Sequence, residues 1–162
     1  MTTTLHATAL VLFGYGVLIR GASGAGKSLL ALALIEHSQR QGDDPRLIGD
    51  DRVRAEIEGD SIVLHGTPGF EGQIELRGRG IIRRPFTQRT TLHLVIDLVD
   101  DLPRLPPLEA FTGEVLGRGV PRAPVPAGDR ADLAHKVLLV AEALAALDQE
   151  TRPEPRMTQN IT

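Results

Sequence analysis

Short apolar runs separated by polar or glycine-containing breaks make up most of the chain. Residues 9–13 and 17–19 are apolar and flank Gly14, Tyr15 and Gly16, a pattern that predicts a β-hairpin. The second arm of this hairpin is followed by a glycine-rich segment and then by a helical pattern. The chain therefore opens with strands that lead into a turn and a helix.

Further strands are predicted along the middle of the chain. Residues 46–49 form a short apolar run, and the weak alternation over 53–64 predicts a second hairpin. Residues 74–82 begin and end with isoleucines and are interrupted by Gly78 and Gly80. Residues 91–99 are the most strand-like segment, and we expect them at the centre of a sheet.

Two helices are predicted, and they differ in pattern. Residues 27–38 are apolar nearly all round, which is typical of a buried helix. Asp129 opens a second helix with Asp132 three residues on, in the manner of a capping box. Its buried face is expected to carry Leu133, Val137, Ala141 and Leu144.

The C-terminal segment 148–162 is polar and broken by proline, so we expect a mobile tail after one domain over residues 1–147.

The glycine-rich segment is the most informative motif. It matches G-x-x-x-x-G-K-[ST] in full and lies between a predicted strand and a predicted helix, the context of a nucleotide-binding phosphate loop. Lys27 is predicted to reach the β and γ phosphates, and Ser28 to offer a hydroxyl to Mg²⁺. The motif comprises Gly21, Ala22, Ser23, Gly24, Ala25, Gly26, Lys27 and Ser28. ATP or GTP is the predicted ligand.

Composition narrows the alternatives. The 162 residues include no cysteine, which excludes disulfides and thiolate catalysis, and the net charge of −3 argues against general nucleic-acid binding. No apolar run reaches the length of about 20 residues that a membrane-spanning helix needs, and no signal peptide is apparent, so we expect a cytoplasmic protein with no membrane partner. Neither a D-x-x-G switch nor an N-K-x-D guanine motif is present, which argues against a GTPase.

Acidic residues at two places are candidates for the chemistry. Asp50 and Asp51 follow a short strand, where one carboxylate can serve a metal and the other accept a proton, although an Asx turn gives the same pattern. Asp97 closes an apolar run in the manner of a Walker-B aspartate and rivals Asp50 as a bare pattern. Spacing alone leaves this choice open.

A third candidate region combines an acid with arginines among glycines, Glu75-Leu76-Arg77-Gly78-Arg79-Gly80-Ile81-Ile82. Glutamate suits Mg²⁺, and arginine suits phosphate through its bidentate fork. A strand with a glycine bulge and solvated charges would look the same. The five histidines show no metal-ligand spacing, and His6 has no special status on pattern alone.

Taken together, His6, the phosphate loop, Asp50-Asp51 and the E-x-R-G-x-G-I-I run resemble the catalytic domain of the bacterial HPr kinase/phosphorylase family over about residues 5–145. The resemblance implies an α/β fold of the P-loop HPr kinase and phosphoenolpyruvate carboxykinase type, with a central mixed sheet, flanking helices and a C-terminal helix. It further implies an ATP- and Mg²⁺-dependent kinase that phosphorylates a serine of HPr, the phosphocarrier of the sugar phosphotransferase system, and in many members also a phosphorylase.

Residue roles follow from the same resemblance. Asp51 matches the base for the serine hydroxyl, and Asp50 would assist it. Glu75 and Ser28 match the Mg²⁺ ligands, and Lys27 the phosphate clamp. The remaining matches to active-site residues are His6, Arg77 and Arg104. Asp97 then becomes an ordinary residue near a strand end.

The chain also departs from the family pattern. Full-length members carry an N-terminal domain, so we expect a natural short form, and Arg83-Arg84-Pro85-Phe86 follows the signature where an acid and a longer glycine-rich loop are usual. The family forms homo-hexamers, and a homo-oligomer is expected here. Two other functions fit the phosphate loop, namely a small-molecule kinase and a non-catalytic ATP-binding sensor.

Overall fold

The computed structural model describes residues 2–151, which form an α/β domain with two helices and two sheets. The strands are β1 (Thr2–Leu5), β2 (Thr8–Leu12), β3 (Tyr15–Arg20), β4 (Arg46–Gly49), β5 (Val53–Glu58), β6 (Ser61–His65), β7 (Gln73–Leu76), β8 (Gly80–Arg83), β9 (Arg89–Val99), β10 (Thr112–Val115) and β11 (Arg118–Pro126). The helices are α1 (Lys27–Arg40), α2 (Leu133–Thr151) and the short 3₁₀ helix η1 (Leu108–Phe111).

Strand β9 organises the larger, nine-stranded sheet, as its apolar pattern predicts. One edge of β9 pairs with β3 in parallel. Its other edge pairs first with β6, antiparallel, and further along with β11, parallel. The full order is β1-β5-β6-β9-β3-β2-β4, with β10 attached to β11, and the predicted central mixed sheet is therefore confirmed.

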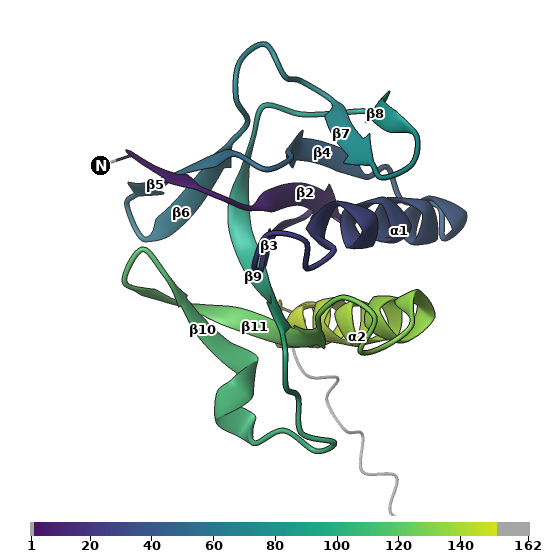
Figure 1. The fold of residues 1–162 in the computed structure, drawn as a ribbon. Helices are drawn as coiled ribbons and strands as arrows, with labels where there is room; N and C mark the ends of the chain where they lie inside the picture. The colour runs from purple at the N-terminus through teal and green to yellow at the C-terminus, as the bar shows by residue number, and fades with distance from the viewer. Residues whose placement is uncertain (1, 152–162) are drawn as a thin grey trace, which may run out of the picture.

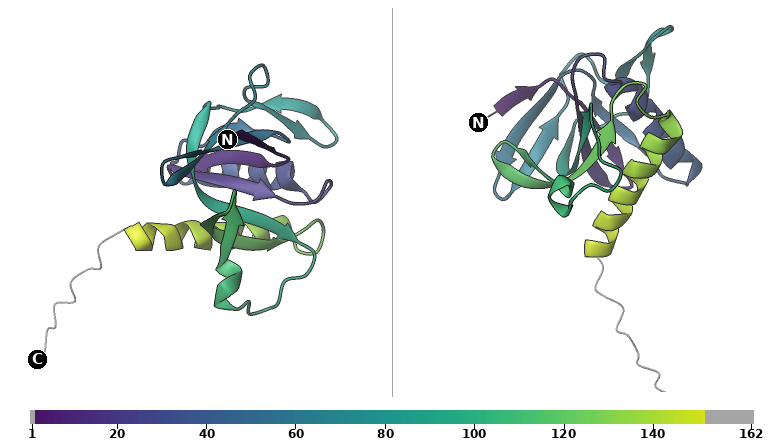
Figure 2. Two further views of the ribbon diagram at one scale, coloured as in Figure 1. Left: turned by 90° about the vertical axis from the view of Figure 1, so that its left-hand side faces the viewer. Right: turned by 60° about the horizontal axis from the view of Figure 1, so that its bottom comes forward.

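Both helices pack on one face of this sheet (Figure 1). Buried residues of α1 and α2 join alternate residues of β3 and β9 in the main core. The opposite face carries a second core, which the strands themselves enclose where β5–β6 and β10–β11 curve away from the helices (Figures 1 and 2). The small β7–β8 hairpin forms a separate sheet and contacts α1 through its buried side.

The predicted hairpins are present, and their turns have a clear local cause. Leu12 pairs with Tyr15, so the turn between β2 and β3 is Phe13-Gly14, with φ of 51° and 81°. Two central residues with positive φ define the type I′ turn that matches strand twist. The next residue along β3, Gly16, packs so tightly that an added Cβ would lie 1.9 Å from the Thr91 carbonyl oxygen.

The start of α2 differs from the prediction. Asp132, rather than Asp129, is the capping residue: its Oδ1 accepts the backbone N–H of His135 at 3.0 Å, and the helix begins at Leu133. Asp129 lies in the preceding turn because Gly128, just before it, has a positive φ of 59°.

The buried face of α2 follows Val140, Leu144 and Leu147, whereas the predicted Ala141 is only half-buried. The helix continues to Thr151, beyond the predicted domain end at residue 147. The rest of the predicted mobile tail, residues 152–162, lies outside the described residues.

Candidate active site

The phosphate loop joins β3 to α1, as its motif requires. Gly24 and Gly26 have φ of 79° and 97°, a conformation that glycine adopts without strain. Gly26 is the residue before α1, and no side chain caps the helix start. The first amide groups of α1 therefore remain available to an anion, as in phosphate-binding helices.

Lys27 is buried beneath the loop and holds it together. Its ammonium group donates hydrogen bonds to the carbonyl oxygens of Gly21 at 3.0 Å and Ala22 at 3.2 Å. The loop is also tied to the segment before α2, because the N–H of Gly128 donates to the carbonyl oxygen of Ala25. These contacts place a positive charge beside the loop amides.

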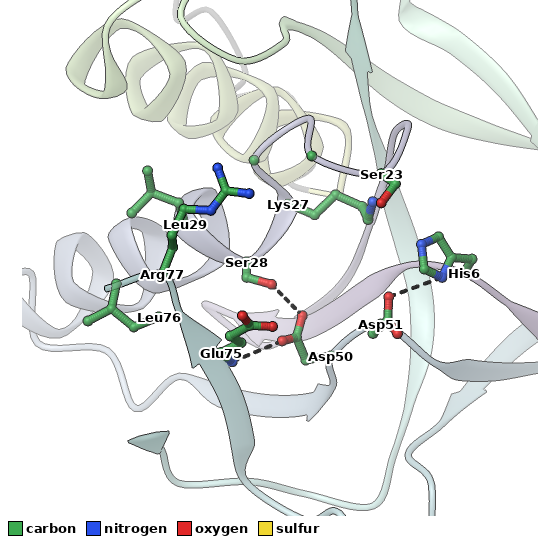
Figure 3. Close-up of a pocket in the computed structure, with 12 residues that line it drawn as sticks. His6, Ser23, Lys27, Ser28, Leu29, Asp50, Asp51, Glu75, Leu76 and Arg77 are labelled. Atoms are coloured by element: carbon green, nitrogen blue, oxygen red, sulfur yellow. Dashed lines mark hydrogen bonds and ion pairs between the residues drawn. The ribbon is translucent and has the colours of Figure 1, made fainter. Parts of the chain in front are cut away.

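Asp50 lies directly after β4, where four elements meet. Its Oδ1 accepts the hydroxyl of Ser28 at 2.7 Å and the hydroxyl of Thr8 at 2.9 Å, and its Oδ2 accepts the backbone N–H of Glu75 at 3.1 Å (Figure 3). All three donors are neutral, so these hydrogen bonds bring no opposite charge to the carboxylate at the mouth of the phosphate loop. Asp50 and Ser28, which were proposed for the site separately, are therefore in direct contact.

Asp51 has a different environment from its neighbour. It adopts a left-handed conformation with φ of 67°, which costs a non-glycine residue of the order of 1 kcal/mol. Its Oδ1 lies 3.0 Å from Nδ1 of His6, which stands between β1 and β2 (Figure 3). Strained backbone is concentrated at functional sites, and here the strained residue places an exposed carboxylate in the wall of a cavity.

Glu75 and Arg77 come from the E-x-R-G-x-G-I-I run, which forms the β7–β8 hairpin. Ile74 is buried in the main core, and this anchors the hairpin beside α1. The Glu75 and Arg77 side chains are exposed and face the phosphate loop across the cavity (Figure 3). The hairpin therefore supplies one carboxylate and one guanidinium to the site.

Residues of the phosphate loop, the Asp50-Asp51 pair, His6 and the β7–β8 hairpin line one cavity of about 500 Å³. Its wall consists of His6, Ser23, Gly24, Gly26, Lys27, Ser28, Leu29, Asp50, Asp51, Glu75, Leu76 and Arg77. Leu29 is half-exposed and offers an apolar surface next to Arg77 (Figure 3). A volume of this size is in the range of small-ligand sites.

Arg104, a predicted site residue, lies elsewhere, and so does Asp97, which the resemblance had already made an ordinary residue near a strand end. Arg104 is exposed in the segment between β9 and η1 and does not line this cavity. Asp97 points to the sheet face opposite the helices, where it binds Arg20 at 2.8 Å and Arg122 at 2.7 Å. Burial alone would raise the pKa of Asp97, but hydrogen bonds and charge from the two guanidiniums bring it below the usual value.

Thr8 is a site residue that the sequence did not indicate. It is fully buried and binds Asp50, yet a threonine in a β-strand has no distinguishing pattern. The arginines near the signature also separate in space: Arg77 lines the cavity, whereas Arg89 forms an ion pair with Glu58 at 2.6 Å. The closeness of these arginines in the sequence did not predict that one would line the cavity and another would pair elsewhere.

The donor set suits a nucleotide-bound Mg²⁺. Among residues 2–151 no three histidine, aspartate or glutamate side chains gather as a complete metal site. Mg²⁺ in kinase sites needs no such cage, since it takes one or two protein oxygens together with phosphates and water. Ser28, Asp50 and Glu75 provide oxygens of that kind in one cavity.

Comparison with known proteins identifies the family. The model of the HPr serine kinase C-terminal domain matches residues 1–134. The chain belongs to this family. A chain from the HPr(Ser) kinase/phosphatase of Coxiella burnetii superposes with a TM-score of 0.72 at 29% identity, covering 91% of this chain and 94% of that one. The family resemblance and the fold class predicted from sequence are therefore confirmed.

Curated relatives support the same assignment. HPr kinase/phosphorylase of Lactococcus lactis is 43% identical over 82 residues, covering 49% of this chain and 24% of the relative. The enzyme of the same name from Bordetella petrii is 35% identical over 131 residues, covering 74% of this chain and 41% of the relative. This HPr kinase domain thus spans about a quarter to two fifths of the length of these relatives. Within residues 2–151 no helix is long and apolar enough to cross a membrane.

Proposed function

We propose that this domain is an ATP- and Mg²⁺-dependent kinase that phosphorylates a serine hydroxyl of the phosphocarrier HPr. The observation that carries the proposal is the pair of adjacent carboxylates at the phosphate loop, with Asp50 bonded to Ser28 and Asp51 free to face the cavity beside His6. Relatives that share this domain are named HPr kinase/phosphorylase.

The phosphate loop and the start of α1 would bind the triphosphate. The backbone N–H groups at the start of α1 and the ammonium of Lys27 neutralise phosphate oxygens. Lys27 would exchange its present carbonyl partners for phosphate oxygens, which bind an ammonium more strongly. Ser28, Asp50 and Glu75 would hold Mg²⁺, which supplies positive charge to the phosphates when bound.

Asp51 would accept the proton of the serine hydroxyl. As the serine oxygen attacks the γ-phosphorus, the bond to the β-phosphate oxygen breaks, ADP leaves and the hydroxyl proton passes to Asp51. His6 fixes the Asp51 carboxylate through its 3.0 Å contact. Arg77 stands across the cavity, where a guanidinium stabilises the negative charge that spreads over the transferred group.

The same residues support the reverse reaction. In that direction inorganic phosphate attacks the phosphoserine phosphorus and would pass its proton to Asp51, the bond to the serine oxygen breaks, Asp51 gives the proton to that oxygen, and pyrophosphate leaves. We also propose that the protein acts in the cytoplasm, where ATP and the carrier are found, and assembles into a homo-oligomer. Hexamers are the assembly that the family resemblance implies.

Mass spectrometry of the carrier tests the proposal. The purified chain is incubated with Mg²⁺-ATP and HPr from the same organism, and a gain of one phosphate on intact HPr is expected. Asp51→Asn should abolish the gain, whereas Asp44→Asn, which alters an exposed aspartate paired with Arg46 at the other end of β4, should not. Phosphorylation of a metabolite without transfer to HPr would indicate a small-molecule kinase instead. ATP binding with no transfer to any acceptor would indicate a sensor.

A further inference from the structure

A second cavity of about 530 Å³ adjoins the first. The two share Ser28, Asp50, Asp51 and Glu75, but the second contains no residue of the phosphate loop before Ser28. Its remaining wall consists of Gly49, Arg52, Thr67, Phe70, Gln73, Ile74 and Ile81. The two carboxylates therefore stand where the cavity of the phosphate loop meets a second space whose remaining wall comes from other parts of the chain.

Two large apolar side chains line this second cavity and are exposed to solvent. Phe70 is 64% exposed and Ile81 is 63% exposed, and they come from different elements, the segment before β7 and strand β8. Scattered apolar residues on a surface are ordinary. An aromatic and a branched side chain on one cavity beside a candidate base form the kind of anchor that protein interfaces use.

The backbone holds both side chains in place. Ile81 pairs with Glu75 across the β7–β8 hairpin, so the two side chains lie on the same face. Phe70 lies in a turn in which its N–H donates to Thr67 and its carbonyl accepts from Gln73, both at 3.2 Å. Gly72, near this turn, packs against the backbone of Arg84 so closely that a Cβ would lie 2.6 Å from its carbonyl oxygen. The apolar pair is thus fixed relative to the Glu75 carboxylate.

The lining of the cavity, more than its size, indicates the occupant. A space of about 530 Å³ has room for more than one side chain around an accepting hydroxyl group. Away from the carboxylates the wall is mixed: Arg52, Thr67 and Gln73 are polar, and Phe70 and Ile81 add exposed apolar surface that a small polar metabolite would not need. The fitting occupant is a serine flanked by apolar side chains on a protein surface.

We infer that the second cavity is the acceptor site of the proposed reaction, and that Phe70 and Ile81 pack against apolar side chains beside the accepting serine of HPr. The inference rests on the proposed function. It assigns nucleotide and acceptor to opposite sides of Asp50 and Asp51, so that the serine oxygen reaches Asp51 from the side away from the phosphate loop. Phe70 and Ile81 then determine acceptor affinity and take no part in ATP binding.

Binding of HPr provides a test that does not depend on turnover. Isotopically labelled HPr is titrated with the chain, in the presence of Mg²⁺ and a non-hydrolysable ATP analogue, and the Kd is obtained from chemical-shift changes. The double variant Phe70→Ser/Ile81→Ser should raise the Kd by about tenfold or more, because each is an anchor of a desolvated contact. Affinity for the ATP analogue should stay within about twofold of the wild-type value, and circular dichroism checks the fold.

Leu105→Ser/Leu108→Ser is the matched control, since these leucines are 89% and 85% exposed and line neither cavity. An unchanged Kd in this control together with weaker binding in the Phe70/Ile81 variant supports the inference. Equal Kd values in all three proteins, or no HPr binding by the wild-type chain, would overturn it. HPr binding that depends on Phe70 and Ile81 without phosphate transfer would instead overturn the proposed kinase and leave the docking surface standing.

Discussion

Two aspartates that follow or close apolar runs, Asp50 and Asp97, have opposite surroundings in the folded chain. Asp50 accepts hydrogen bonds from two hydroxyls and one amide beside the phosphate loop. Asp97 binds the guanidiniums of Arg20 and Arg122 on the other face of the sheet. The hydrogen-bond donors to the first carboxylate are neutral, whereas the charge of the second is offset by two guanidiniums within the protein.

The difference comes from strand geometry. Side chains alternate across a strand, so Leu94, Ile96 and Leu98 of β9 face the helices and Asp97 faces away from them. Asp50 comes after the last residue of β4 and is no longer part of the pleat. Whether an aspartate near the end of a strand has a chemical or a structural role therefore depends on the face of the sheet that its side chain occupies and on the cations nearby.

The strongest test of this difference removes one carboxylate charge at the cavity and one on the opposite face of the sheet. Asp51→Asn should lower phosphate transfer to HPr by about 10²- to 10⁴-fold, the usual contribution of a general base. Asp97→Asn should leave transfer per folded molecule within about twofold, because its side chain faces away from the cavity. Initial rates from intact carrier mass measure both effects. Equal losses in the two variants would contradict the division of roles.

The free energy of unfolding should respond in the opposite order, with the larger loss in Asp97→Asn and the smaller in Asp51→Asn. Asp97→Asn leaves Arg20 and Arg122 without a counter-charge in a largely buried cluster, and the free energy of unfolding should fall by about 2–3 kcal/mol. Asp51→Asn removes an exposed, strained aspartate and should change it by less than about 0.5 kcal/mol. Urea titration followed by circular dichroism measures both. A stable Asp97→Asn protein would show that the cluster contributes little.

Much of the fold around Asp50 and Asp97 could be predicted from the sequence, but the sheet face of Asp97 could not. The phosphate loop, the hairpins and the central strand follow from local patterns, since each depends on residues near one another in the chain. The face of Asp97 could not be inferred, because β9 is apolar on both sides and its alternation is hidden. Only tertiary structure shows which core each residue joins.

The remaining site residues depend on long-range packing. Thr8 reaches Asp50 because β2 pairs with β4, a contact between residues 42 apart in the chain. Glu75 and Arg77 reach the loop because Ile74 packs in the main core beside α1. Arg104, matched by resemblance alone, lies outside the cavity because its segment leads from β9 toward η1.

Low pH should reduce the contribution of Asp97 to stability. The pKa of Asp97 is lower in the folded chain than in the unfolded one, so its contribution to stability is fully present above about pH 4 and is lost as pH falls through the folded pKa. The stability difference between wild type and Asp97→Asn should therefore be constant from pH 7 to about pH 5 and shrink below pH 4. Urea titrations at several pH values measure it. A difference that grows in acid would contradict the assigned direction.

The smallest expected effect concerns the support of Asp50. Thr8→Val keeps the shape of a buried side chain and removes the hydroxyl that donates to Asp50 Oδ1 at 2.9 Å. Since Ser28 still donates to the same oxygen, kcat/KM for HPr should fall only about threefold to tenfold, equivalent to about 1 kcal/mol. Thr8→Ser retains the hydroxyl and should keep most of the activity.

If Thr8→Val and Thr8→Ser lose activity equally, packing of the methyl group, and not the hydrogen bond, is what matters at Thr8. If Thr8→Val loses activity as fully as Asp51→Asn, the position of Asp50 is far more sensitive than one hydrogen bond implies. The intermediate result would instead show that Asp50 is held by several neutral donors together, each of them replaceable. This is the property that separates it from Asp97, whose two charged partners fix it in one place.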